Sequence, residues 1–350
     1  MNEVFEYKKA LDELYFTPEQ KAEIARRAAK AAAEQQPRRS RPVWRTALIA
    51  AALAAVLAVG AGASGVLKTA VEALGPIFGG SPAQTEVIDK IGYPVGASDT
   101  DNGITITADA VMGDRCNAAI VYTVRRDDGT ALLPEGVAPE ELLIRGAGTD
   151  VQILGGSHGG SWFVDEDPGD DQLQIVQTVS SDVELIGASA AAEFDNLYRW
   201  DTETGESIPV LEGHWKFRFD LDYEDASVTL GGGETFTQDG MTFTIDAVTI
   251  SPVALTADYT VNEEVQWSNS GSGKVSEADA REQARYFENV EILLTKTDGT
   301  VVDLSNAGGS ISPEGGVTVC SKGTVFSQIV PMEEMASLSV GGVIFPLTEN

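Results

Sequence analysis

Two histidines are the side chains of this 350-residue sequence best suited to acid–base or metal chemistry. His158 lies in "GGSHGGSW" and His214 in "GHWKF", and neither has another His or a Cys at zinc-ligand spacing. Ser157 and Ser161 flank His158, but neighbours in an extended chain face opposite ways, and the hydrolase nucleophile elbow is missing. We therefore expect a glycine-rich surface loop around His158, no enzymatic activity and no cofactor.

Two acidic stretches contain oxygen ligands that suit a hard cation such as calcium. "DTDNG" covers residues 99–103, and "DEDPGDD" covers residues 165–171. The first also fits a tight turn with positive φ, and the second fits a solvated turn around its Pro-Gly pair. We favour a turn in both places, so no metal site is predicted.

Aromatic residues and cysteines allow two further readings. Trp162, Trp200, Trp215 and Trp267 could line a carbohydrate-binding face, although such residues more often anchor a β core. Cys116 and Cys320 could form a bridge, but two unpaired buried thiols are the commoner arrangement.

A repeat reveals the elements that must position these residues. "GITITADAVMGDRCNAAIVYTV" (residues 103–124) aligns without a gap with "GMTFTIDAVTISPVALTADYTV" (residues 240–261), at an offset of 137 positions. Each copy opens with a glycine turn and alternates with period 2, which is typical of half-buried strands. A repeat of this length indicates a duplicated domain. We predict two tandem immunoglobulin-like β-sandwiches, with one helix capped by Ser276 in the second.

A charge-free stretch of 21 residues, 47–67, precedes this body. As a helix it extends roughly 31 Å, about the thickness of the hydrocarbon core of a bilayer. A cleaved signal and a buried core helix are the alternatives to a retained anchor. Arg38, Arg39, Arg41 and Arg45 crowd its N-terminal flank, which places the N-terminus in the cytoplasm and the C-terminal body outside.

Charge divides the chain in the same place. Residues 1–46 hold 10 Lys and Arg against 7 Asp and Glu, whereas the remainder holds 14 against 47. An acidic body repels nucleic acid, so we predict no nucleic-acid partner.

The N-terminal head carries two short amphipathic helical patterns, the second beginning at Thr17 and Pro18. So few residues cannot sustain a core alone, yet apolar side chains are offered to the cytoplasm. This favours a hairpin that docks on a cytoplasmic protein, with adsorption on membrane lipid as the alternative. The head has no Cys or His, which excludes a zinc-held form. The candidate partner-binding residues are Phe5, Tyr7, Leu11, Leu14, Tyr15, Phe16 and Ile24.

"EYKKALDELYFTPEQKAEIARRA", a single span and then "IGYPVGASDTDNGITITADAVMGD" resemble a family of uncharacterised, anti-sigma-factor-like, single-pass envelope proteins of Gram-positive bacteria. In that family a domain of unknown function precedes an immunoglobulin-like domain outside the membrane. The resemblance implies a signal-transduction role with a sigma factor as the cytoplasmic partner.

The predicted organisation has five parts. They are a partner-binding segment (1–42), a transmembrane helix (43–68), a tether (69–98), a first β-sandwich domain (99–230) and a second (231–350). The predicted function is a membrane-anchored regulator with an exported sensor body. The alternative is a cell-surface binding module for glycan or cation with no signalling role.

Overall fold

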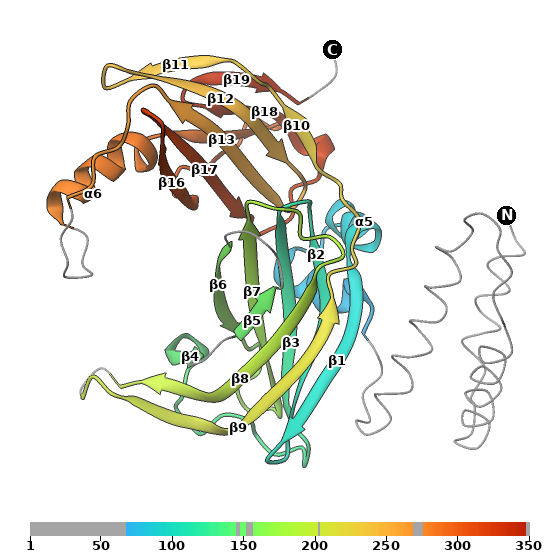
Figure 1. Ribbon diagram of the computed structural model, residues 1–350. Helices are drawn as coiled ribbons and strands as arrows, with labels where there is room; N and C mark the ends of the chain where they lie inside the picture. Colours follow the sequence, from blue (N-terminus) through green and yellow to red (C-terminus); the bar gives the residue numbers. More distant parts are fainter. Residues whose placement is uncertain (1–67, 145–147, 152–156, 202–203, 269–275, 348–350) are drawn as a thin grey trace, which may run out of the picture. The chain divides into compact units, whose positions relative to one another are not determined.

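A computed structural model describes residues 68–144, 148–151, 157–201, 204–268 and 276–347 (Figure 1). They belong to one compact unit, Gly65–Asn350, and form a mainly β protein, as the sequence predicts. The head and the charge-free stretch 47–67 lie outside the described residues. Within the described ranges, no helix is both long enough and apolar enough to cross a membrane.

The first β unit, formed by strands β1 to β9, contains two sheets that share one core. The larger sheet has the order β1-β2-β3-β7-β6 with antiparallel neighbours, and the smaller has the order β4-β8-β5, with β9 also paired to β8. Trp215, Tyr122 and Phe194 are fully buried in this core. The bounds are β1 Tyr93–Asp101, β2 Ile104–Gly113, β3 Asn117–Arg126, η1 Pro139–Glu141, β4 Leu142–Ile144, β5 Gly148–Val151, β6 Ser157–Val164, β7 Gln172–Ser181, β8 Ser189–Trp200 and β9 Ser207–Asp220.

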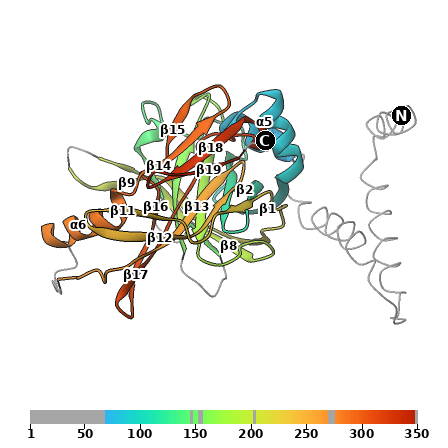
Figure 2. The same ribbon diagram turned by 90° about the horizontal axis from the view of Figure 1, so that it is seen from above.

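The second β unit, formed by strands β10 to β19, repeats this plan of two sheets. Most of its strands are labelled in Figure 2. One sheet has the order β10-β12-β13-β17-β16, with β11 also paired to β12, and the other has the order β15-β14-β18-β19. Ser276 caps α6, the one α-helix among the described residues of this unit, as predicted, and its side chain accepts from the Asp279 N–H. The bounds are β10 Val228–Leu230, β11 Thr235–Gln238, β12 Met241–Ile250, β13 Ala254–Val261, α6 Glu277–Gln283, the π-helical turn η2 Ala284–Glu288, β14 Ile292–Lys296, β15 Val301–Asp303, β16 Gly308–Glu314, β17 Val317–Val325, η3 Met332–Glu334, β18 Met335–Val340 and β19 Val343–Pro346.

The sequence repeat corresponds to equivalent hairpins, β2–β3 and β12–β13. Both contain a β-bulge at the same repeat position, Asp109 in the first and Asp246 in the second. Each bulge carboxylate accepts a hydrogen bond from a threonine of the neighbouring strand, at 2.5 Å from Thr123 and 2.7 Å from Thr260. The duplication therefore preserves a strand irregularity together with the side-chain pair that satisfies it.

Residues 69–98, predicted as a tether, differ from that expectation. Two helices, α4 (Ala70–Phe78) and α5 (Pro82–Ile91), occupy most of the segment, and β1 follows. Each helix starts with a capping box, in which the side chain of Thr69 or Ser81 accepts from the backbone three residues on. The helices lie against β2 of the first unit's larger sheet (Figure 1), and their buried residues, such as Leu74, share an apolar cluster with Val121 of β3. Of the Pro and Gly residues that suggest a linker, Gly75 and Pro76 lie inside α4, Pro94 and Gly96 lie in β1, and the others lie at helix boundaries.

Lys68 fixes the start of this helical pair. Its ammonium group donates to the bulge carboxylate of Asp109 at 3.0 Å and to Thr123 Oγ1 at 2.9 Å. Asp109 is buried, so the ion pair compensates a carboxylate that water does not solvate. Lys68, the residue that directly follows the charge-free stretch, is thus tied to the first unit.

The two β units meet at equivalent turns. Asp114, in the turn after β2, accepts a 2.7 Å hydrogen bond from the hydroxyl of Ser251, which occupies the same repeat position after β12. Asn117 Nδ2 donates to Thr256 Oγ1 at 3.2 Å, and the Ile329 N–H donates to the Phe78 carbonyl at 2.8 Å. The helical pair therefore contacts both units.

Candidate functional site

His158 lies in strand β6 and not in the loop predicted from its glycine neighbours. The strand pairs with β7 along its whole length. A Cβ on Gly159 would lie 1.9 Å from the Thr178 carbonyl oxygen, so glycine is needed for the close approach of the two strands. The glycines that indicate a loop in the sequence are thus a requirement of the sheet.

Strand β6 is an edge of its sheet. Residues 157–162 are exposed, and the strand contains no Lys, Arg, Asp, Glu or Pro. Charged residues and proline are the usual means by which proteins protect sheet edges. Among the described residues, no further strand pairs with this edge, and the edge lacks the common protection by charged residues or proline.

The edge strand β9 shows the opposite treatment, and it explains the "DTDNG" motif. The backbone N–H groups of His214 and Lys216 donate to the carboxylates of Asp101 and Asp99, at 2.9 and 2.8 Å. Asn102 and Gly103 have φ of 50° and 73° and form the β1–β2 turn. The motif is thus a turn, as favoured, and its two aspartates cap a neighbouring strand edge.

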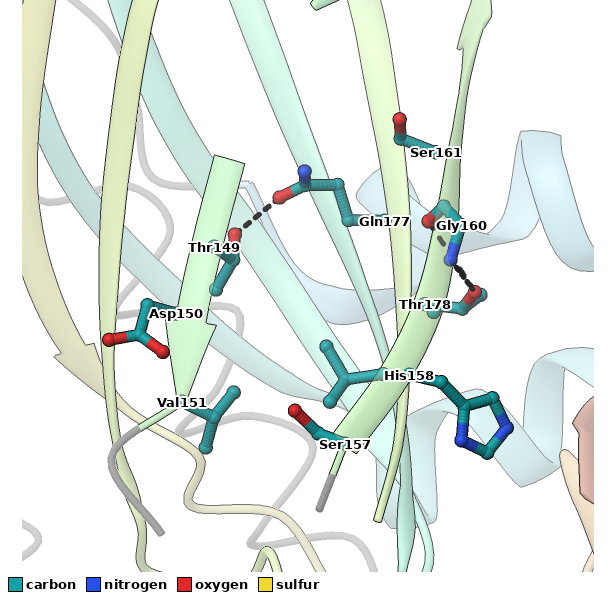
Figure 3. Close-up of a pocket in the computed structure, with 11 residues that line it drawn as sticks. Thr149, Asp150, Val151, Ser157, His158, Gly160, Ser161, Gln177 and Thr178 are labelled. Atoms are coloured by element: carbon teal, nitrogen blue, oxygen red, sulfur yellow. Dashed lines mark hydrogen bonds between the residues drawn. The ribbon is translucent and has the colours of Figure 1, made fainter. Parts of the chain in front are cut away.

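A cavity of about 280 Å³ opens between β5 and β6 (Figure 3). Hydroxyl, carboxylate and amide groups dominate its wall, and the residues include Thr149, Asp150, Val151, Ser157, Ser161 and Gln177. Figure 3 shows Val151 and Ser157 turned toward this opening, whereas the imidazole of His158 points to the other side of β6. The lining suits hydrogen bonding to a polar or cationic group.

A chain of hydrogen bonds among Tyr122, Thr149 and Gln177 borders the cavity on its core side. Thr149 Oγ1 contacts both the Tyr122 hydroxyl and Gln177 Oε1. Burial raises the pKa of Tyr122, so its phenol stays protonated. This chain fixes β5 against β7 and orients the amide of Gln177.

The second unit places different groups at the corresponding position. Gln177 is paired with Ile120, and Lys322 is paired with Ala257, which is the repeat equivalent of Ile120. The Lys322 ammonium is buried and donates to the carbonyls of Phe287 and Val290, at 2.9 and 3.0 Å. Its nitrogen also lies 5.0 Å from the centre of the Phe287 ring.

The Phe287 ring closes the second unit where the first is open. Gly309 pairs with Lys322 as Ser161 pairs with Gln177 in the first unit. A Cβ on Gly309 would lie 3.0 Å from the Phe287 ring. Burial lowers the pKa of Lys322 to about 8, against an ordinary value of 10.5. Equivalent positions therefore hold an aromatic plug in one unit and an open polar cavity in the other.

A groove of about 370 Å³ lies on the opposite side of β6, between the first and second units. Its wall includes His158, Trp162, Thr178, Gly308, Val325 and Ser327. Trp162 is 38% exposed and meets the edge of Phe78, with ring centres 6.4 Å apart. Loss of water around the ring lowers the pKa of His158. The groove thus combines an accessible indole with a neutral imidazole.

His214 belongs to a separate charged cluster, which the sequence does not predict. Pairing of β8 with β9 places Glu193 opposite Lys216 and Asp195 opposite His214. Glu193, Asp195 and His214 offer ligand atoms within 4.8 Å of one another, close enough for a metal ion. However, the Lys216 ammonium contacts Glu193, and a hydrogen bond from His214 Nδ1 to Asp195 raises the pKa of His214. As built, the cluster is two exposed cross-strand pairs.

The acidic loop 165–171 is a turn of the kind favoured from its sequence. Carboxylates of Asp165, Asp167 and Asp170 accept from backbone N–H groups two residues further along, at 3.0, 3.2 and 2.9 Å. Such bonds within a loop stabilise the turn.

The tryptophans and cysteines occupy unrelated places. Trp215 is fully buried and donates to the Ile104 carbonyl at 2.8 Å, which fits the core interpretation. Trp162, Trp200 and Trp267 are 38%, 44% and 41% exposed, so that interpretation is wrong for these three. Cys116 and Cys320 are free thiols, and burial raises their pKa values to about 11 and 12.

The predicted partner-binding residues of the head lie outside the described residues. The structure therefore neither brings them together nor separates them. They are Phe5, Tyr7, Leu11, Leu14, Tyr15, Phe16 and Ile24.

Comparison with known proteins gives one family and one structure. Residues 38–126 match the family described as "Domain of unknown function (DUF4179)", so the match ends at the last residue of β3. No curated protein matches the chain. A solved structure described as "The crystal structure of the conserved domain protein from Bacillus anthracis" is 18% identical, with a TM-score of 0.47. The similarity covers 71% of this chain and 76% of that one. The chain is thus a mainly β protein containing a match to an uncharacterised domain.

Proposed function

We propose that this protein is a membrane-anchored regulator resembling an anti-sigma factor. Residues 1–42 bind a cytoplasmic transcription regulator, residues 43–68 cross the membrane of a Gram-positive cell, and the body senses a signal in the envelope. In this proposal each β unit is an immunoglobulin-like sandwich. The proposal includes no catalytic role.

The observation that carries the proposal is the position of Lys68. This residue is tied to Asp109 of the body, and it directly follows a charge-free stretch long enough to span a bilayer and flanked by arginines on its other side. The change from a basic head to an acidic body at the same stretch supports opposite sides of the membrane.

Co-purification tests the role of the head. The full-length chain, expressed in its host and extracted in detergent, should retain a sigma-type subunit of RNA polymerase. Leu11→Asp and Phe16→Asp should abolish this, because they place a charge on the predicted apolar stripe. Lys21→Asp, outside that set, is the matched control. Recovery of lipid alone, or equal loss in the control, contradicts the proposal.

Thiol labelling tests the orientation. A Cys introduced for the exposed Ser310 should react with a membrane-impermeant maleimide in intact cells, whereas one introduced for Glu6 should react only after lysis. The native thiols suit this experiment because their raised pKa values keep them protonated and slow to react. The reverse pattern would place the body in the cytoplasm.

A cell-surface binding module for glycan or cation is the second candidate. The exposed indole of Trp162 beside a groove and the Glu193–Asp195–His214 cluster favour it. Calcium- or zinc-dependent thermal stabilisation of the full chain, lost in Asp195→Asn, would support this reading over the regulator.

A further inference from the structure

We propose that strand β6 binds an extended cationic peptide as an additional antiparallel strand. The side chains of this peptide alternate between the cavity beside β5 and the groove that faces the second unit. The proposal concerns the body alone, so it does not depend on what the head binds.

The first argument is the contrast between two sheet edges. The β9 edge is capped by two carboxylates from β1, which satisfy backbone N–H groups that would otherwise recruit another strand. Strand β6 has eight residues, is exposed from Ser157 to Trp162 and carries none of the residues that discourage pairing. A protein that protects one edge and leaves the other bare offers the bare edge for strand addition.

The second argument is the position of the two hollows. The polar cavity lies on the side of β6 to which Ser157 turns, and the groove lies on the side to which His158 points (Figure 3). Side chains of an added strand point alternately to these same two sides, because the period of a strand is two residues. A bound peptide would thus place successive side chains in opposite hollows. Peptide recognition by strand addition takes its specificity from such alternate pockets.

The third argument is space at the edge. Around Gly160, whose N–H donates to the Thr178 hydroxyl at 3.2 Å, a Cβ would have only that hydroxyl nearby, at 3.9 Å, so this face of the strand has room for the side chains of a bound peptide. The equivalent edge strand of the second unit, β16, contains Pro313, and the opening behind it is filled by Phe287. Only the first unit therefore combines an open edge with an open cavity among the described residues.

Charge identifies the class of peptide. Asp150 lines the cavity, and the acidic loop 165–171 follows β6 directly. Residues 47–350 as a whole hold 47 acidic against 14 basic side chains, which attract cations at long range. Trp162 in the groove suits an apolar side chain. The expected ligand alternates Lys or Arg with aliphatic residues. A glycan lacks the regularly spaced amide groups that pair with β6 as an added strand.

Calorimetric titration of the full-length chain in nonionic detergent at physiological salt tests the proposal. The probe is the peptide Val-Lys-Val-Lys-Val-Lys-Val, acetylated and amidated. We expect a Kd of roughly 1–100 µM, as for a small interface. Methylating alternate backbone nitrogens should weaken binding at least about tenfold, because it removes hydrogen bonds of about 1 kcal/mol each. A peptide with the same residues arranged in two blocks should also bind at least about tenfold more weakly than the alternating peptide.

Variants of the protein locate the site. Ser161→Lys should abolish binding, since it fills the cavity and repels the peptide, and Ser161→Met should weaken it without adding charge. Ser310→Lys, the same change on the exposed edge strand of the second unit, is the matched control and should bind like the unmodified chain. Circular dichroism confirms that each variant is folded.

Several outcomes would overturn the proposal. They are no binding of the alternating peptide, equal binding of the methylated or block peptide, or equal loss in Ser161→Lys and Ser310→Lys. Competition by chitohexaose with no effect of backbone methylation would assign the groove to glycan. Because no cytoplasmic partner is present, failure here leaves the regulator proposal untouched, and failure of co-purification leaves peptide binding untouched.

Discussion

The two β units use the same hairpin in different surroundings. In the first unit the outer face of β3 presents Ala119 and Val121, which are buried under α4 and α5. In the second unit the equivalent positions of β13 are Thr256 and Asp258, which are only partly buried. The inner faces are alike, with Tyr122 and Tyr259 fully buried at the same position. The inner face of the hairpin is thus apolar in both units, whereas the residues of its outer face differ according to what covers that face.

The largest expected change in unfolding free energy comes from giving each unit the outer-face residue of the other. Val121→Asp places a carboxylate under the helices and should cost about 4 kcal/mol or more of unfolding free energy. The reverse exchange, Asp258→Val, should change stability by about 1 kcal/mol or less, because its site is partly solvated. Urea unfolding of the full chain measures both. Similar losses in the two variants would contradict the difference between the faces.

Substitution at Lys322, beside the Phe287 plug of the second unit, should cost more unfolding free energy than substitution at Gln177, beside the cavity of the first. Lys322→Met leaves the Phe287 and Val290 carbonyls without their donor and should cost about 2–4 kcal/mol. Gln177→Met removes one contact beside an open cavity and should cost about 1 kcal/mol. Equal losses in urea unfolding would remove the distinction between plug and cavity.

Removing the bulge carboxylate should also cost more unfolding free energy in the first unit than in the second. Asp109→Ala removes the partner of Lys68 and Thr123 from a buried site and should cost about 1–3 kcal/mol. Asp246→Ala removes one exposed hydrogen bond to Thr260 and should cost about 0.5 kcal/mol. Lys68→Met should recover much of the Asp109→Ala loss in the double variant, which a double-mutant cycle would detect. Additive losses would show that the pair does not act as a unit.

Lys322 also gives the second unit its own pH dependence. Its pKa is about 8 in the fold and 10.5 ordinarily, so below pH 8 both states are charged and the full burial penalty is present. Between pH 8 and 10.5 the folded form loses its proton first, and the contribution of Lys322 to unfolding free energy rises. Subtracting the Lys322→Met curve cancels thiol and tyrosine titrations. A flat or falling difference would contradict this assignment.

The smallest expected difference is between the pKa values of the two histidines of the first unit. Partial desolvation lowers the pKa of His158, and the hydrogen bond to Asp195 raises that of His214, so their NMR titrations should fall on opposite sides of 6.5. Asp195→Asn should lower the pKa of His214 and leave that of His158 unchanged. Coincident titrations would mean that the groove and the charged cluster are equally solvated.

The sequence predicts the parts of the fold that depend on local patterns. The repeat, the period-2 strands and the Ser276 cap all follow from residues close together in the chain. Signals for α4 and α5 were also present. Thr69 and Glu72 form one capping box, and the first copy reads "AAIVY" where the second alternates as "LTADY". An apolar run on both faces of a strand indicates a covered sheet, but the prolines and glycines nearby favoured a tether.

The candidate site depended on long-range pairing, which the sequence could not supply. Asp195 meets His214 only because β8 pairs with β9 around a bulge near Asn196. The edge position of β6 follows from its pairing with β7 alone. Residues of the cavity come from strands whose association is set by the whole core. Patterns of neighbouring residues carry no information on which strand ends a sheet.

The contact between Asp114 and Ser251 has a consequence for how far the two units can differ. Equivalent residues touch each other, and Ala119 and Ala254 lie in one apolar cluster, as Asn117 and Thr256 are hydrogen bonded across the same contact. Self-complementary contacts of this kind are the mark of a symmetric dimer. The contact between the two units therefore has the reciprocal pattern of a symmetric dimer interface, although both units belong to one polypeptide. A single chain does not require its two halves to stay alike, which fits the open cavity beside β6 and the Phe287 ring at the equivalent place in the second unit.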